Sequence, residues 1–205
     1  MDFRKLLDKW SHLDYINPED IPNIELYMDQ VTTFMDSQLS GCKRTPEDKI
    51  LTKTMINNYS KNHLLPPSNK KKYSKEHIIL LIYIYYLKNF LSISDIKNLL
   101  TPLTELFYDT NNPSISFEEI YTELFHEETK HYDALKKDIF RTMKDSRSTF
   151  SQIENPDEKE FLQNLAFVTT LSYDIYLKKQ IIESIIDNFY APSDEDAKKK
   201  KKKKN

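Results

Sequence analysis

Glycine is almost missing from this chain, with Gly41 the single example in 205 residues. Strand-rich folds use glycine for bulges and tight turns, and phosphate-binding loops use it to bring the backbone close to a ligand. Neither kind of structure can be common here. The chain is rich instead in tyrosine and phenylalanine, with 13 and 11 residues. The composition therefore predicts an all-α or nearly all-α fold.

Cysteine and long hydrophobic runs are scarce as well. The single cysteine, Cys42, has no partner for an internal disulfide and fits a reducing compartment. The most apolar run, Ile78–Leu87, is far shorter than the roughly 18 residues needed to span a bilayer. Residues 1–10 carry charges and lack the apolar core of a signal peptide. We therefore expect a cytoplasmic protein without membrane association, in which residues 78–87 form a buried helix.

Positive charge is concentrated in two segments of a chain whose net charge is −2. Residues 43–78 contain nine lysines and arginines against three acidic residues, and Lys198–Lys204 is an unbroken lysine run. The first concentration predicts an anionic partner. The tail, 191–205, is too charged to fold. We expect it to be a solvated, disordered end, with added affinity for DNA or anionic lipid as the alternative.

Helix start and stop signals divide the chain into four parts: a short helix and loop at 1–22, a first domain at 23–101, a helical region at 115–190, and the tail. The first domain opens with a helix from Asn23 that ends before Gly41. Thr45 and Thr52 are both good helix caps, so residues 46–63 form either one helix or a short turn and a second helix. The other expected helices are 75–91 after Ser74, a short helix from Ser92 through Leu100 that Pro102 ends, 116–146, and 158–190.

The two long helices, 116–146 and 158–190, are expected to bury apolar stripes and to offer a dimerisation surface. Ser116 and Glu119 form a capping box at the start of the first of them. Neither helix shows the sustained heptad repeat that is typical of a long coiled coil. The expected buried side of the second helix consists of Leu165, Val168, Ile175, Ile182, Ile185 and Phe189.

A polar helix stands before two prolines and three lysines in the segment LTKTMINNYSKNHLLPPSNKKKYSKEH, residues 51–77. On a helical wheel, its apolar side holds Leu51, Met55, Ile56 and Tyr59, with Leu64 following. Its polar side holds Lys53, Thr54, Asn57, Asn58 and Lys61. Asparagine can pair with adenine and lysine with guanine or phosphate, so this side has the chemistry of a helix in a DNA major groove. The alternative is the solvated side of an ordinary amphipathic helix.

Three consecutive lysines, Lys70, Lys71 and Lys72, follow after Pro66-Pro67 turn the chain. They lie on a short loop or a two-stranded wing, and lysines at a loop tip suit contacts with phosphates. The apolar helix at 78–87 gives both elements a rigid support.

This order of features resembles the MerR-type winged helix-turn-helix domain. There, a capped recognition helix ends in a tyrosine, Leu-Leu-Pro-Pro follows, a basic wing closes on a tyrosine, and a hydrophobic helix leads to Ser-x-x-Asp/Glu-Ile-x-x-Leu-Leu. The matching positions, within about 24–101, are Thr52, Tyr59, Leu64, Leu65, Pro66, Pro67, Lys70, Lys71, Lys72, Tyr73, Ser92, Asp95, Ile96, Leu99 and Leu100. Through IPNIELYMDQVTTFM, the chain is also similar to an uncharacterised bacterial family that carries such a domain.

The resemblance implies a sequence-specific DNA-binding protein that regulates transcription and binds duplex DNA as a homodimer. The expected DNA-binding residues are Lys53, Thr54, Asn57, Asn58, Lys61, Lys70, Lys71, Lys72, Tyr73 and Lys75. The chain departs from the MerR pattern at Asn57-Asn58, where Arg-Tyr is usual, and at His63, where glycine is usual. It also has a shorter wing and an insert near 37–49. These departures support the alternative, a protein-interaction module on the same scaffold without DNA readout.

Other patterns that suggest chemistry are weak. His126 and His131 are five positions apart, about 140° around a helix, so they cannot share one metal ion from a regular helix. Cys42 precedes Lys43-Arg44, which favours a reactive thiol, but a structural cysteine is the better interpretation. Neighbouring carboxylates such as Glu118-Glu119 show no opposed environments. We therefore expect no enzymatic activity, catalytic residue, metal or cofactor, and the sequence identifies no small-molecule effector.

Overall fold

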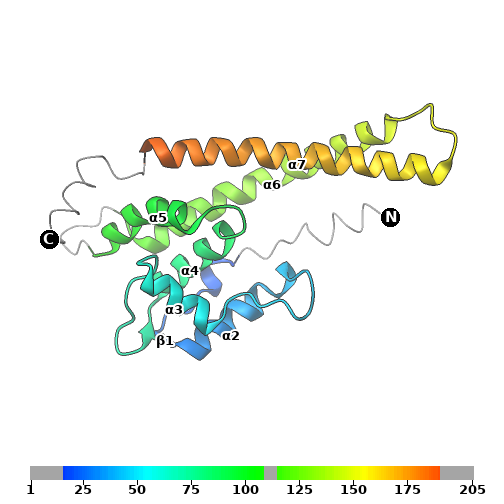
Figure 1. Cartoon of the computed structure of the whole chain (residues 1–205). Helices are drawn as coiled ribbons and strands as arrows, with labels where there is room; N and C mark the ends of the chain where they lie inside the picture. The colour runs from blue at the N-terminus through cyan, green and yellow to red at the C-terminus, as the bar shows by residue number, and fades with distance from the viewer. Residues whose placement is uncertain (1–15, 109–114, 190–205) are drawn as a thin grey trace. The chain divides into compact units, whose positions relative to one another are not determined.

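The computed structural model describes residues 16–108 and 115–189. This part of the chain is mainly helical, as the sequence predicted (Figure 1). Its elements are η1 (Pro18–Asp20), β1 (Leu26–Tyr27), α2 (Met28–Gln38), η2 (Ser40–Cys42), α3 (Lys53–Lys61), β2 (Lys72–Tyr73), α4 (Lys75–Leu87), α5 (Ile93–Tyr108), α6 (Phe117–Ser148) and α7 (Pro156–Phe189). The expected N-terminal helix, the break after Pro102 at 109–114 and the lysine tail lie wholly or largely outside the described residues.

The described residues form two compact units. The first unit contains 16–108, 115–125 and 183–189, and the second contains 126–182. This division lies within α6, after Phe125, whereas the sequence places a boundary near residues 101–115.

Helix α4 is the centre of the first unit. Its residues Ile78 to Ile82 and Ile84 are fully buried, as the apolar run predicted. Val31 and Met35 of α2 and Ile56 of α3 are fully buried as well. The helix begins at Ser74, which forms a capping box with His77. A rigid apolar helix therefore supports the polar elements of this unit.

A two-stranded sheet joins the start of α2 to the segment before α4. Strand β1 pairs antiparallel with β2, with Leu26 opposite Tyr73 and Tyr27 opposite Lys72. The prediction of a helix from Asn23 was therefore wrong at its start, because residues 26–27 are extended and α2 begins at Met28. Two residues are too few to show the alternating pattern of a strand. The partner strand also lies far along the chain, so the local sequence does not indicate the pairing.

The segment before α3 forms a turn. Residues Thr45–Asp48 close through a bond from the Asp48 N–H to the Thr45 carbonyl at 3.1 Å. The Asp48 carboxylate accepts from the N–H and the hydroxyl of Thr45 and from the N–H of Arg44, and these bonds hold the pKa of Asp48 below its ordinary value. Asp48 thus provides an acceptor for backbone N–H groups that have no backbone partner where a turn or helix begins. Of the two alternatives for residues 46–63, the short turn followed by a second helix is confirmed.

Helix α5 continues through Pro102 to Tyr108, so the prediction that Pro102 ends the helix was wrong. The hydroxyl of Thr101 donates to the Lys97 carbonyl at 2.6 Å, and that of Thr104 to the Thr101 carbonyl at 2.7 Å. Proline removes one backbone donor and disfavours the helix, but surrounding packing can outweigh this cost. Leu100 and Ile96 of this helix are buried.

Helix α6 is tied to the first unit at its start. Ser116 and Glu119 form the predicted capping box, with bonds of 2.7 and 3.1 Å. The buried hydroxyl of Tyr121 donates to the Ile16 carbonyl at 2.6 Å, and its ring meets that of Tyr83 edge-on. These contacts fix residues 117–125 against the N-terminal end of the described chain.

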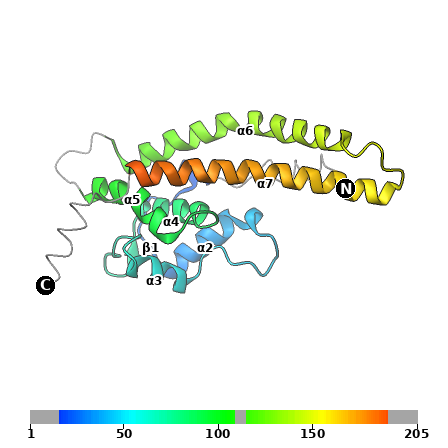
Figure 2. The ribbon, with the colours of Figure 1, turned by 45° about the horizontal axis from the view of Figure 1, so that its top comes forward.

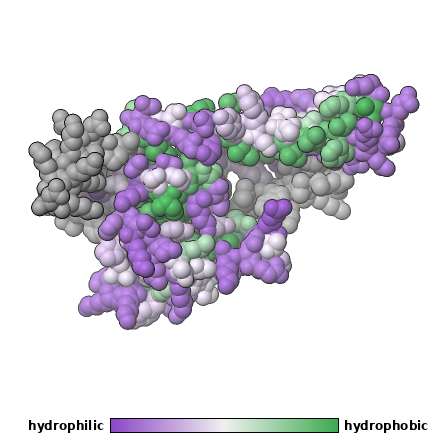
Figure 3. Space-filling model, in the orientation of Figure 1, coloured by the Kyte–Doolittle hydropathy of each residue, from purple (hydrophilic) through white to green (hydrophobic). Residues whose placement is uncertain are grey.

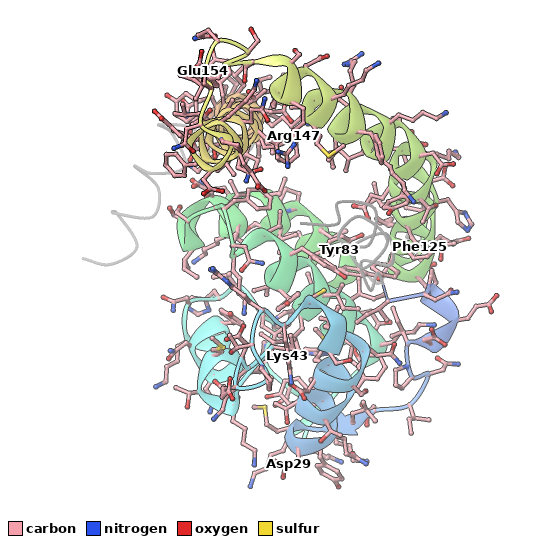
Figure 4. All side chains as sticks on the ribbon, turned by 90° about the vertical axis from the view of Figure 1, so that its right-hand side faces the viewer. Asp29, Lys43, Tyr83, Phe125, Arg147 and Glu154 are labelled. Atoms are coloured by element: carbon pink, nitrogen blue, oxygen red, sulfur yellow. The ribbon has the colours of Figure 1, made fainter. Side chains whose placement is uncertain are left out.

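The second unit is a helical hairpin formed by most of α6 and α7 (Figure 2). The connection is held by Gln163, whose buried amide donates to the carbonyls of Arg147 and Thr149 at 2.8 and 3.1 Å. Figure 4 shows Arg147 near the end of α6, beside α7. Phe150 has a φ of 51° at this turn.

The expected buried side of α7 is largely exposed. Leu165, Val168 and Ile175 in the second unit are each 45–62% exposed. In the first unit, Ile185 and Phe189 are exposed, whereas Ile186 is buried. The prediction that this stripe is buried was therefore wrong for the single chain. Within the described residues, no helix combines the length and apolar character needed to cross a membrane.

Candidate nucleic-acid interface

Helix α3 begins and ends at well-formed caps. The Thr52 hydroxyl accepts a bond from the Met55 N–H at 3.2 Å, as the sequence predicted. At the other end, the N–H of Leu64 donates to Tyr59 at 2.9 Å and that of His63 to Ser60 at 3.1 Å. This is a Schellman motif in which His63, with a φ of 57°, occupies the position that glycine prefers. The helix is therefore short and sharply bounded.

The two sides of α3 separate as the helical wheel predicted. Ile56 and Tyr59 are buried, together with Leu51 and Leu64 at its ends. The opposite side is exposed and consists of Lys53, Thr54, Asn57, Asn58 and Lys61. Because the buried side is fixed on the core, these polar groups have a defined outward direction.

Lys70 and Lys71 form the tip of a tight hairpin. Asn69 and Lys72 exchange two backbone hydrogen bonds, of 3.1 and 2.8 Å, around these two residues. Lys70 and Lys71 have φ angles of 47° and 65°. This is the conformation of a type I′ turn, which strongly favours Asn-Gly. Left-handed φ costs a non-glycine residue roughly 1–2 kcal/mol. The basic hairpin, residues 69–72, therefore holds two exposed lysines in an unfavourable conformation.

Three of the predicted lysines have carboxylate partners, and two of these pairs, those of Lys53 and Lys72, are exposed to solvent. Lys53 pairs with Asp29, which Figure 4 labels on α2, and Lys72 lies 3.9 Å from Glu25. Lys72 is also 5.6 Å from the centre of the Tyr27 ring. All four charged groups are substantially exposed, so these pairs are weak and can exchange for other partners. Sequence reasoning missed both carboxylates, because no local pattern connects them to their lysines.

Lys61, Lys70 and Lys71 show no ion pair with any residue in the described ranges 16–108 and 115–189. Three ammonium groups on α3 and the basic hairpin therefore face solvent without a carboxylate partner in that part of the chain. Figure 1 shows the hairpin loop near α3 in the first unit.

Two predicted site residues have other roles in the structure. Tyr73 is buried in the sheet and meets the ring of His77 edge-on, with ring centres 5.7 Å apart. The ammonium of Lys75 lies 2.8 Å from Glu118 of α6, and its side chain is only 13% exposed. The structure thus brings eight of the ten predicted residues to the exposed surface of α3 and the hairpin, and places Tyr73 and Lys75 beneath or beside it.

His77 supports the base of the hairpin. Burial is the main cause that lowers its pKa, while hydrogen bonding to Pro67 and Pro66 and the charges of Glu76 and Glu25 act in the opposite direction. The imidazole is held at the start of α4, where its Nδ1 accepts a hydrogen bond from the Ser74 N–H at 3.2 Å. The spacing of Ser74 and His77 matches that of a capping box with histidine in place of glutamate or glutamine. This spacing is the sequence signal that could have indicated the role of His77.

The histidines set aside as metal ligands, His126 and His131, belong to the second unit. His131 meets Glu127 of the same helix at 3.2 Å, and both residues belong to α6 in the second unit. Among the residues that the structure describes, no cluster of three His, Cys, Asp or Glu side chains is arranged to hold a metal ion.

The first unit is a small helical domain in which a two-stranded sheet and a basic hairpin adjoin a polar helix. A family model described as a domain of unknown function, DUF1836, matches residues 16–124. The match covers more than half of the chain, so the chain belongs to the DUF1836 family, and the expectation of an uncharacterised family is confirmed. The match ends next to the division between the two units at residue 125. Comparisons with curated proteins and with solved structures give no match.

Proposed function

We propose that this protein binds duplex DNA through α3 and the basic hairpin, as a MerR-like winged helix-turn-helix regulator of transcription. The observation that carries the proposal is the conformation of Lys70 and Lys71. Strained backbone persists where the surrounding structure enforces it, and it clusters at functional sites. Two lysines stand where Asn-Gly would be more stable, and what they add is exposed positive charge.

The polar side of α3 supports the same proposal. Its five exposed residues fall at positions 53, 54, 57, 58 and 61, which is one side of a helix about 14 Å long. The diameter of an α-helix with its side chains, about 10–12 Å, fits the width of a DNA major groove, about 12 Å. In this arrangement Asn57 and Asn58 contact base edges, while Lys61 and the hairpin lysines contact phosphates on the flanking backbone.

The order of elements is consistent with a winged helix-turn-helix. A short strand precedes the helix pair α2 and α3, and it pairs with a strand that leads out of the hairpin into α4. The proposal includes a homodimer on a two-fold DNA site, a cytoplasmic location where the chain meets DNA, and no catalytic activity. It names no effector.

A salt titration tests the proposal. The wild-type chain is mixed with labelled genomic fragments, including the promoter of its own gene, and binding is measured by fluorescence anisotropy. The dissociation constant should rise steeply with salt, with a logarithmic slope of about 0.9 for each phosphate contact. An absence of binding even at about 50 mM salt would refute DNA binding.

A protein-interaction module without DNA readout is the second candidate. The ion pairs favour it, because carboxylates of the same chain hold Lys53, Lys72 and Lys75. Asn57 and Asn58 stand where the MerR pattern has Arg-Tyr. The arginine that would contact a phosphate is therefore missing. Salt-insensitive binding of a protein partner through α3, with no affinity for DNA, would favour this candidate over the first.

A further inference from the structure

The described part of the second unit, residues 126–182, does not bury a hydrophobic core of its own. Between residues 126 and 182, the buried side chains are Ser146, Gln163 and Phe167. Gln163 serves the turn, and the Ser146 hydroxyl donates to the Thr142 carbonyl of its own helix at 2.8 Å. Only Phe167 among them is apolar. Helices in water are stabilised mainly by packing of their apolar sides, so this hairpin needs a further surface to cover it.

Helix α7 carries an exposed apolar stripe in coiled-coil spacing. Phe161, Leu165, Val168 and Ile175 are 63%, 45%, 57% and 62% exposed. With Ser172 between them, their spacing is four, three, four and three residues, which keeps them on one side of a helix. Tyr176 is exposed beside this stripe. We call Phe161, Leu165, Val168 and Ile175 the α7 stripe. Figure 3 shows hydrophobic residues at the surface of the hairpin.

The same segment is almost free of charge. Residues 161–177 contain one charged side chain, Asp174, which pairs with Lys178 at 2.7 Å. The facing helix is highly charged, with Glu127, Lys130, Lys137 and Arg141 among its exposed residues. Interface cores are depleted in charge and enriched in aromatic residues, whereas solvated helices carry charge. Residues 161–177 therefore have the composition of a covered surface.

We propose that the α7 stripe is the surface through which two copies of this chain associate. An uncharged stripe can face its own copy without like-charge repulsion, as a two-fold interface requires. Its 4-3 spacing is the one that lets two identical helices interlock.

The exposed area is sufficient for such a dimer. Five exposed apolar side chains lie on this side of α7, and each presents on the order of 100 Å². Their sum of roughly 500 Å² per partner gives about 1,000 Å² in a two-fold dimer, which reaches the lower limit of a specific interface. These residues are Phe161, Leu165, Val168, Ile175 and Tyr176.

Sedimentation of the purified full chain tests the proposal, without DNA. The wild type should sediment as a dimer at micromolar concentration. Val168→Glu places a charge in the centre of the stripe and should raise the dimer dissociation constant about 100-fold. Thr170→Glu is the matched control, since Thr170 is exposed on the same turn but about 200° away around the helix. This variant should remain dimeric.

Two measurements guard against a misfolded variant. Circular dichroism should show the same helix content for both glutamate variants, and Ile175→Glu repeats the test in the next turn of the stripe. Purified tagged and untagged wild-type copies should also retain one another when mixed. A wild type that sediments as a monomer at every concentration overturns the proposal, whatever covers the stripe. So does a Val168→Glu chain that dimerises as tightly as Thr170→Glu. A failure of DNA binding leaves these results unchanged.

Discussion

The backbone N–H of Ser74 donates a hydrogen bond to Nδ1 of His77 at 3.2 Å, so the buried imidazole is neutral and carries its hydrogen on Nε2. The Ser74 hydroxyl lies 2.9 Å from the same nitrogen. A proton on Nδ1 would break this cap and place positive charge at the N-terminal end of α4, where the helix dipole opposes it. The cap at the start of α4 therefore depends on a neutral ring.

We expect the free energy of unfolding to fall as the pH decreases below about 6.5. Burial lowers the pKa of His77 in the folded chain below its ordinary value of 6.5, so the unfolded chain binds a proton first on acidification. The contribution of His77 is complete above that pH and is lost below it, by about 1.4 kcal/mol for each unit of pKa lowering. Denaturant titrations between about pH 7.5 and pH 5.5 measure this loss.

The variant His77→Gln isolates the effect, because glutamine at this position keeps the capping box without a titrating ring. Its stability should depend less on pH than that of the wild type over this interval. Equal slopes for the two proteins would show that His77 is not the group responsible.

The second unit should depend on one buried amide. Gln163→Leu leaves the carbonyls of Arg147 and Thr149 without their shared donor, and we expect it to destabilise the hairpin by about 1–2 kcal/mol. Gln163→Glu, nearly the same shape, should cost at least as much, because an ionised carboxylate faces two carbonyl oxygens with no hydrogen to donate. Urea unfolding followed by circular dichroism compares the three chains. If the glutamate variant is as stable as the wild type, the two bonds do not hold the turn.

Sequence periodicity was sufficient to predict α3. The Thr52 cap, the buried Ile56 and Tyr59 and the five exposed polar residues are all local features of an amphipathic helix. The same holds for α4, whose apolar run has no polar side, for the helix cap at Ser74 and for the capping box at Ser116. These elements are determined by residues three or four positions apart.

Features set by distant contacts could not be predicted in this way. The pairing of Leu26 with Tyr73, and the ion pairs of Lys53 and Lys75, join segments that are far apart in the chain. The left-handed backbone at Lys70 and Lys71 is opposed by their residue type, so the sequence argues against the turn that forms. For α7, the sequence indicates that an apolar stripe exists, but periodicity says nothing about what covers it.

Asn57 and Asn58 should govern the choice of DNA sequence and leave general affinity almost unchanged. Both are exposed on α3, and a bidentate bond between an amide and adenine discriminates by about 1–3 kcal/mol per base pair. Selection of binding sites from a random library compares the wild type with Asn57→Ala and Asn58→Ala. Each variant should lose preference at one or two positions of the site.

Asn62→Ala is the control for this experiment. Asn62 is an exposed amide at the end of the same helix, but it donates to the Asn58 carbonyl at 2.8 Å and caps the helix. Its removal should leave the selected sequence unchanged. Identical sites for the wild type and all three variants would exclude α3 as the element that reads DNA.

Replacing both residues of the hairpin tip tests the central claim most directly. Lys70→Asn with Lys71→Gly supplies the residues that a type I′ turn favours, and we expect it to stabilise the first unit by about 1–2 kcal/mol. The same variant removes two phosphate contacts, so its affinity for DNA should fall and its logarithmic salt slope should decrease by about 1.8. The double variant Lys70→Ala with Lys71→Ala removes the charges without relieving the backbone, and it should lose affinity with no gain in stability. Opposite changes in stability and DNA affinity for the Asn-Gly variant are the predicted result. An Asn-Gly variant that is more stable and still binds DNA as the wild type does, with the same salt slope, would contradict the account.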